Sequence, residues 1–154
     1  MGSLERVSII CSKGSLDMAY PGLVLANAAR LSGIEVTMFF TFWGLDIVNK
    51  SKVDDLHLSI VGNTSLPIPA MIAGLPGVEH LATTQMKKEM AKLDIPPVRE
   101  FITILSDSGC GLFACQLAMD MFKLKREDLV PEISDVITAM DFYDKTGDGQ
   151  IIFI

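Results

Sequence analysis

The sequence predicts an α/β fold: an open, mainly parallel sheet with helices on both faces. Its 154 residues fit a single domain, which we expect to span residues 1–154. Apolar residues make up 49% of the chain, and such a content is ordinarily buried in a sheet covered on both faces or in a subunit interface. Short apolar segments alternate with helical ones, which is the order of a parallel sheet.

The first third of the chain predicts one strand–helix–strand unit. Residues 7–11 form a short apolar, β-branched segment that is typical of a buried strand. A polar turn follows, and the apolar spacing over 18–31 predicts a helix capped by Ser15 or Asp17. Residues 34–40 predict the next strand. Because a helix separates the two strands, they must lie parallel with a right-handed crossover.

The middle of the chain predicts an irregular insertion at about residues 50–82. After a short helix from Leu45, this segment carries proline, glycine and methionine among scattered apolar residues. Such a segment packs on its own core, against a partner subunit or over a site.

The remaining segments continue the alternation of helices and strands. We expect helices at 84–93 and 96–106, a strand at 110–114, a short helix at 116–122, a turn at 125–129, a helix at 133–143 and a closing strand at 150–154. The whole pattern is that of a flavodoxin-like or Rossmann-like α/β subunit.

The charge of the chain excludes several classes of partner. Its formal net charge of −6 provides no basic field for nucleic acid or an anionic lipid surface. No apolar segment approaches the roughly 18 residues needed to span a bilayer, and the start of the chain lacks a signal-peptide pattern. We therefore expect a cytoplasmic protein without a transmembrane segment. Its three cysteines indicate free thiols rather than a disulfide framework.

Cys115 is the strongest candidate for chemistry, because it stands between the third strand and the following helix. At this edge of a parallel sheet, free helix N–H groups favour a thiolate nucleophile, although a buried, inert cysteine is the alternative. Cys11 ends the first strand at the same edge and is a possible second thiol or a core cysteine. Cys110 begins the strand that Cys115 ends, roughly 16 Å away, so no disulfide between them is expected.

No metal or cofactor is expected. Asp144, Asp148 and Gly149 resemble part of a calcium-binding loop, but the carboxylate required at its twelfth position is missing, so an Asp-Gly turn is favoured. His57 and His80 lie 23 residues apart without further ligand spacing. The turn after the first strand matches no nucleotide-binding motif, and an ordinary turn or an anion site are its two interpretations.

Several segments together resemble the DsrE/DsrF/DsrH-like sulfur-relay family and, within it, the DsrE2-like branch. They read CSKGSLDMAYPGLVLANAA, EVTMFFTFWGL, AGLPGVE and ACQLAMDMF. The resemblance spans residues 7–154 and implies a DsrE-like fold and a homo-oligomer. It also implies a cysteine that accepts sulfane sulfur, as persulfide or thiosulfonate, and passes it to a small TusA-like carrier. Cys115 occupies the place of that cysteine.

We therefore predict a sulfur-relay protein or sulfurtransferase in which Cys115 attacks a small sulfur-containing donor such as thiosulfate, tetrathionate or a persulfide. The residues expected to bind this donor are Ser12, Lys13, Gly14, Thr41, Trp43 and Gln116. Two alternatives stay open. One is a non-catalytic assembly module that docks a redox complex or a membrane through its apolar insertion, and the other is a thiol peroxidase.

Overall fold

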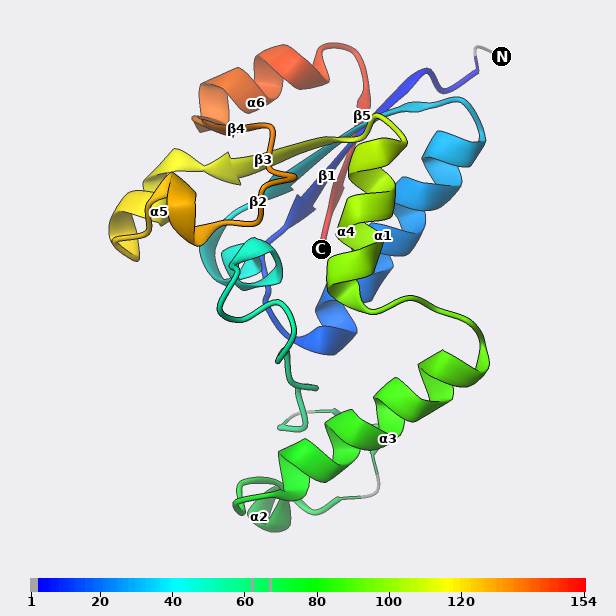
Figure 1. Cartoon of the computed structure of the whole chain (residues 1–154), viewed down its shortest axis with the longest axis vertical. Coiled ribbons are helices and arrows are strands. Elements are labelled where there is room, and N and C mark those ends of the chain that lie inside the picture. Colours follow the sequence, from blue (N-terminus) through cyan, green and yellow to red (C-terminus); the bar gives the residue numbers. More distant parts are fainter. Residues whose placement is uncertain (1–2, 62, 67) are drawn as a thin grey trace.

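The computed structural model describes residues 3–61, 63–66 and 68–154, and its centre is a five-stranded sheet (Figure 1). All neighbouring strands are parallel, in the order β4-β3-β2-β1-β5. The strands are β1 (Arg6–Cys11), β2 (Glu35–Phe40), β3 (Gly111–Cys115), β4 (Asp135–Ile137) and β5 (Gln150–Phe153).

Helices cover both faces of this sheet, as the sequence predicts. The α-helices are α1 (Leu16–Leu31), α2 (Ala70–Ala73), α3 (Val78–Lys92), α4 (Val98–Asp107), α5 (Gln116–Met121) and α6 (Ala139–Thr146). The described ranges also contain the 3-10 helices η1 (Phe42–Val48) and η2 (Arg126–Asp128). Helices α1 and α4 lie side by side on one face, and α6 lies on the other (Figure 1).

The central strand β2 shows why both faces must be covered. Its residues from Val36 to Phe40 are all buried, so it lacks the polar alternation of a half-exposed strand. Met38 packs towards Gly22 of α1, whereas the ring of Phe39 stacks on Phe142 of α6 with centroids 4.9 Å apart. Alternate side chains of one strand therefore build two separate apolar layers.

The predicted helix at 133–143 is wrong, because this segment divides into strand β4 and helix α6. The β-branched pair Val136 and Ile137 extends the backbone and pairs with β3. Thr138 then caps α6: its Oγ1 accepts a hydrogen bond from the Asp141 backbone N–H at 3.2 Å, and the Asp141 carboxylate accepts one from the Thr138 N–H at 2.8 Å. This capping box starts the helix after the strand.

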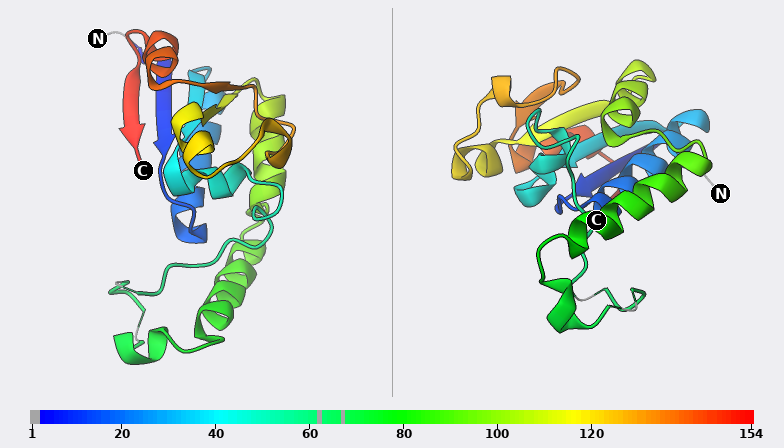
Figure 2. Two further views of the ribbon diagram at one scale, coloured as in Figure 1. Left: turned by 90° about the vertical axis from the view of Figure 1, so that its left-hand side faces the viewer. Right: turned by 60° about the horizontal axis from the view of Figure 1, so that its bottom comes forward.

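The predicted insertion is only partly irregular. Helix α3 begins at Val78, six residues before its expected start, directly after Gly77, whose positive φ of 90° suits glycine. Residues 58–92, as far as they are described, form an arm that extends away from the sheet and its covering helices (Figures 1 and 2). We call the remainder the body.

None of the helices in the described ranges is long and apolar enough to cross a membrane.

Candidate functional site

The carboxyl ends of the parallel strands meet at one edge of the sheet. Cys11 lies opposite Phe40, and Phe40 lies opposite Ala114. One residue further along β3, Cys115 lies opposite Ile137 of β4. The strand register therefore brings the ends of β1, β2, β3 and β4 together, and ligands of open α/β sheets collect at such an edge.

Cys115 is the last residue of β3 and the residue that precedes α5. Its backbone is extended, with φ −75° and ψ 120°, and the helix begins at Gln116. The residue is 6% exposed and belongs to the apolar core. The thiol accepts no hydrogen bond from the first turn of α5 among the described residues.

Cys11 and Cys115 lie on opposite faces of the sheet. The Cys11 Sγ would lie 3.0 Å from a Cβ on Gly22, so Cys11 faces α1. Phe113, two residues before Cys115, carries Lys145 of α6 over its ring at 4.6 Å. Because side chains alternate along a strand, Cys115 shares the α6 face with Phe113. The sheet itself therefore separates these two thiols within one chain.

The other two cysteines are buried in the α1 face of the core. Burial raises the pKa of the Cys11 thiol to about 12 and that of the Cys110 thiol to about 12. Both groups are therefore protonated at neutral pH, and a protonated thiol is a poor nucleophile. All three cysteines are free.

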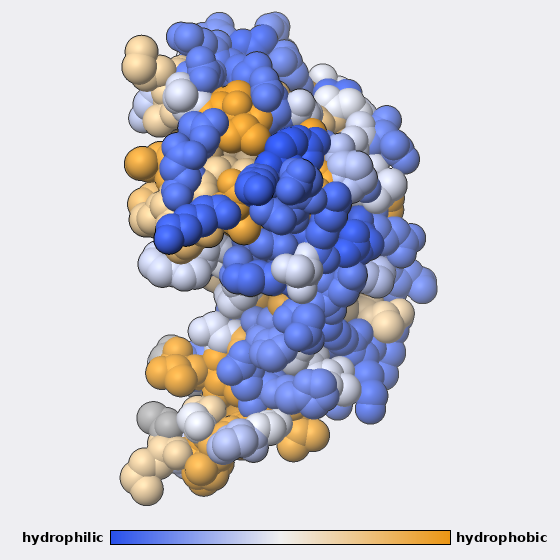
Figure 3. Space-filling model, turned by 60° about the vertical axis from the view of Figure 1, so that its left-hand side comes forward, coloured by the Kyte–Doolittle hydropathy of each residue, from blue (hydrophilic) through white to orange (hydrophobic). Residues whose placement is uncertain are grey.

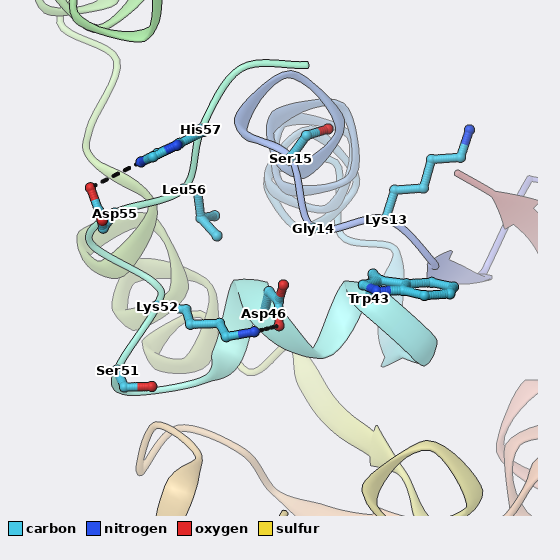
Figure 4. Close-up of a pocket in the computed structure, with 10 residues that line it drawn as sticks. All are labelled: Lys13, Gly14, Ser15, Trp43, Asp46, Ser51, Lys52, Asp55, Leu56 and His57. Carbon is cyan, nitrogen blue, oxygen red and sulfur yellow. Dashed lines mark hydrogen bonds and ion pairs between the residues drawn. The ribbon is translucent and has the colours of Figure 1, made fainter. Parts of the chain in front are cut away.

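Three of the residues expected to bind a donor lie in one pocket of about 480 Å³ (Figure 4). Lys13 and Gly14 come from the turn after β1, and Trp43 comes from η1. Figure 4 shows Lys13 and Trp43 on one side of the pocket, with Lys52 and His57 on the other. The turn approaches η1 so closely that a Cβ on Gly14 would overlap the Trp43 carbonyl oxygen, which explains the glycine.

Ser12 and Gln116, two of the other predicted binding residues, use side-chain polar groups in contacts outside this pocket, and Thr41 is held by a backbone contact. The Ser12 hydroxyl donates a hydrogen bond to the Ile154 carbonyl at 2.8 Å. The Thr41 backbone N–H donates to the Cys11 carbonyl at 3.0 Å, and the Gln116 Nε2 donates to Asp120 at 2.8 Å.

Cys115 does not line this pocket, as far as the described residues define it. Trp43 connects the two regions, because its ring lies 5.8 Å from that of Phe122, the residue after α5. The structure thus gathers Lys13, Gly14 and Trp43 in one pocket, and Cys115 is not among the described residues that line it.

Sequence reasoning missed the charged half of this pocket. The Lys52 Nζ pairs with Asp46 at 2.9 Å. The two ring nitrogens of His57 lie 2.9 Å from a Glu79 oxygen and 3.3 Å from an Asp55 oxygen. No short motif indicates these contacts, since Glu79 belongs to α3 of the arm and meets His57 only after folding.

The suspected calcium-binding loop is the end of a helix and a turn. Asp144 lies within α6, and Gly147, with φ 55°, ends this helix before β5. Glycine at a helix end with positive φ is a common stop signal.

Fold and site together define an α/β domain with a cysteine at the strand-to-helix junction of its carboxyl edge. The chain belongs to the DsrE/DsrF/DrsH-like family, whose model matches residues 3–154, and this confirms the resemblance seen in the sequence. It is similar to the sulfur carrier protein DsrE2 of Allochromatium vinosum, with 29% identity and 96% of each chain covered. The protein YrkE of Bacillus subtilis is 26% identical, with 97% of each chain covered.

Two solved structures share the fold. The ychN protein of E. coli superposes with a TM-score of 0.56 at 14% identity, covering 98% of this chain and all of its own. The protein MTH1491 of Methanobacterium thermoautotrophicum gives a TM-score of 0.54 at 12% identity, covering 97% of this chain and 99% of its own. At these identities the likeness establishes the α/β architecture.

Proposed function

We propose that this chain is a sulfur carrier that accepts sulfur on Cys115 and passes it to a small TusA-like carrier protein. The observation that carries the proposal is the position of Cys115 at the β3–α5 junction in a chain of the DsrE/DsrF/DrsH-like family. The similarity over 96% of the chain to a protein named as a sulfur carrier supports it.

The transfer needs no external oxidant or reductant. The Cys115 thiolate attacks the outer sulfur of a donor persulfide, a new S–S bond forms, and the donor leaves as its thiolate. With thiosulfate the leaving group is sulfite. With tetrathionate it is thiosulfate, and a thiosulfonate group remains on Cys115. The thiolate of the acceptor then attacks the sulfur bonded to the Cys115 Sγ. This S–S bond breaks, the Cys115 thiolate is regenerated, and the acceptor carries the persulfide or thiosulfonate group.

The protonated state of the other thiols supports this choice of cysteine. The raised pKa values of Cys11 and Cys110 disfavour the thiolate that the attack requires. Cys11 also lies on the opposite face of the sheet from Cys115. We therefore assign Cys11 no part in loading Cys115 of the same chain.

Intact-mass measurement tests the loading step. After treatment with tetrathionate, thiosulfate or a glutathione persulfide, the wild-type chain should gain one sulfur atom or one thiosulfonate group. Cys115→Ala should gain nothing, whereas the matched variants Cys11→Ala and Cys110→Ala should load like the wild type. An adduct that persists in Cys115→Ala would overturn the assignment.

Transfer to the acceptor is a separate measurement. The loaded chain is mixed with a reduced TusA-like protein, and the adduct should disappear from Cys115 and appear on the acceptor cysteine. A loaded chain that keeps its sulfur in the presence of this acceptor would contradict that partner.

We propose that Lys13, Gly14 and Trp43 contribute to donor binding from the pocket of Figure 4. Lys13 supplies the cation that faces an anionic donor, and Trp43 links the pocket to the segment after α5. Lys13→Ala should slow loading by thiosulfate, a dianion, more than loading by cysteamine persulfide, whose ammonium group offsets the charge of its persulfide. Equal slowing by both donors would argue against a role of the Lys13 charge.

We further propose that the chain works as a homo-oligomer in the cytoplasm, where thiols stay reduced. The apolar residues Val24 and Leu25 of α1 are exposed. Phe153 is 70% exposed on β5, which forms one edge of the described sheet. Exposed apolar groups at a strand edge favour association. Light scattering should give a multiple of the chain mass, and a monomer at every concentration would contradict this.

A second candidate function is supported by the arm. Residues 58–78 contain no charged residue, and Met71 and Leu81 of the arm are 91% and 70% exposed. Figure 3 shows hydrophobic surface at the lower end of the molecule, where the arm lies. An assembly module that docks through this surface would lose partner binding in Met71→Ser and keep it in Cys115→Ala. A sulfur carrier would instead lose sulfur loading in Cys115→Ala.

A further inference from the structure

A second cavity, of about 300 Å³, lies where the arm meets the body, and we call it the junction cavity. Its wall contains three buried residues: Leu16 of α1, Val98 of α4 and Val53 of the segment after η1. Met90 of α3 lines its arm side. Tyr20 of α1 completes the wall. The cavity therefore sits between three helices. It shares no lining residue with the pocket of Figure 4, although adjacent residues of the chain line the two, and Cys115 is not among the described residues of its wall.

Most of the wall of the junction cavity is apolar, and the hydroxyl of the half-buried Tyr20 in it is already satisfied. The Tyr20 hydroxyl donates a hydrogen bond to the Pro96 carbonyl at 2.9 Å, and the Tyr20 ring packs edge-on against Phe101 at 6.3 Å. The apolar part of such a cavity offers too few hydrogen-bond partners for ordered water, and it accepts apolar groups instead. Its volume lies at the lower end of the range for small-molecule sites.

The mouth of the junction cavity carries one unneutralised positive charge. The Asp54 carboxylate is held by Arg99 through contacts of 2.8 to 3.0 Å, so this pair is neutral as a whole. Lys87 of α3 adds a second ammonium group, and its only hydrogen bond among the described residues is a long one of 3.4 Å to the Asp54 backbone carbonyl. The Lys87 charge is thus available to an anion.

We propose that the junction cavity binds a small amphipathic anion, whose alkyl chain fills the apolar space while its carboxylate pairs with Lys87. The apolar wall selects the chain, and the positive mouth selects the sign of the head group. Such a ligand would contact α1, α3 and α4 at once and would therefore hold the arm against the body.

Titration calorimetry on the full chain tests this with a series of straight-chain carboxylates from butanoate to dodecanoate, each below its micelle concentration. We expect saturable binding with one optimal chain length, because the cavity has a fixed volume. The alcohol of that length should bind more weakly than the carboxylate. An absence of saturable binding throughout the series, or equal binding of alcohol and carboxylate, would overturn the proposal.

Two variants and one matched control locate the site. Lys87→Glu should weaken carboxylate binding about tenfold and favour the alkylammonium of equal length, because the charge at the mouth is reversed. Lys88→Glu makes the same change next to it, outside the cavity wall, and should bind like the wild type. Met90→Trp should block the cavity and abolish binding. Equal losses in Lys87→Glu and Lys88→Glu would place the ligand elsewhere.

A failed titration would leave loading of Cys115 untouched, because the cavity and the cysteine share no residue. Mass measurement of Cys115 loading in Lys87→Glu therefore separates the two proposals: this variant should load sulfur at the wild-type rate.

Discussion

The three cysteines show how strongly the surroundings of a residue decide its chemistry. Cys11 and Cys110 lie under α1 in the apolar core, and burial raises the pKa of each to about 12. Cys115 occupies a different position: the chain turns from strand to helix directly after it, and it lies on the other face of the sheet. Its residue type is shared with the other two, so only position distinguishes it.

The buried thiols predict a loss of stability in alkali. In the unfolded chain each thiol has an ordinary pKa of 9.0, but in the folded chain the pKa is about 12. Between these values the folded chain binds more protons than the unfolded chain, so the free energy of unfolding decreases as pH rises. Each thiol contributes a slope of about 1.4 kcal/mol per pH unit in this window.

Urea unfolding at a series of pH values above about 9 measures this slope. The double variant Cys11→Ala, Cys110→Ala should show a flatter decline than the wild type, whatever its absolute stability. Parallel declines in the two proteins would show that other groups cause the alkaline loss.

Among the secondary-structure elements, the contact between η1 and the end of β1 is the tightest one near the site. A Cβ on Gly44 would overlap the Cys11 carbonyl group, which is backbone and cannot rotate away. Gly44→Ala should therefore cost about 1–3 kcal/mol or more in the free energy of unfolding. Gly74→Ala is the matched control, since its Cβ would meet nothing within 4 Å and its φ is −85°. Chemical denaturation should separate the two variants, and equal stabilities would contradict the close approach.

The capping box of α6 gives a prediction at the same scale. Thr138→Ala removes the hydroxyl that accepts from the Asp141 N–H, and it should lower the free energy of unfolding by about 1 kcal/mol. Hydrogen bonds from Thr138 also lower the pKa of Asp141, so the stabilisation by this carboxylate is present at neutral pH and is lost as pH falls through the lowered pKa.

Thermal unfolding of the α6 variants should show this pH dependence. The difference between wild type and Thr138→Ala should be full at pH 7 and smaller in acid, whereas Thr138→Ser should keep most of the cap. A difference that stays constant into strong acid would exclude the Asp141 contribution.

Sequence periodicity predicted the strands β1, β2, β3 and β5 within one or two residues, because each is an apolar segment bounded by turn residues. It failed at β4, where three residues are too few to show a period and the helical pattern of α6 extends across them. The Thr138–Asp141 spacing was the available signal, since a capping box marks a helix start.

The candidate site was also predictable in part, because the sequence shows where the strands end. Cys115 ends a strand, Lys13 and Trp43 lie shortly after strands, and a parallel sheet places all such residues at one edge. Sequence could not predict that Cys11 and Cys115 face opposite sides, because this depends on the register of neighbouring strands. Nor could it predict Asp46 and His57 in the pocket, whose partners include the distant arm residue Glu79.

At the scale of the whole molecule, the arm and the body are joined by few contacts. Helix α3 meets the body through the Glu79–His57 pair, the long Lys87 contact and Met86, which packs against the core. Within the arm, the Leu58 backbone N–H donates to the Thr83 hydroxyl at 2.9 Å. The junction cavity also lies between α3 and the body. We therefore expect the arm to open locally at a lower free energy than the sheet.

Thr83 of α3 provides the sharpest test of this local stability. It is one of the few buried polar residues, with an exposed fraction of 4%. Thr83→Val keeps its shape but leaves the buried Leu58 N–H without its acceptor, a loss of about 1–3 kcal/mol. If arm and body open separately, hydrogen exchange should accelerate over 78–92 and stay unchanged in β1 to β3, whereas Thr83→Ser should exchange like the wild type. Equal acceleration in the sheet would mean that the arm and the body unfold as one cooperative unit, and the ligand proposed for the junction cavity would then stabilise the whole chain rather than the position of its arm.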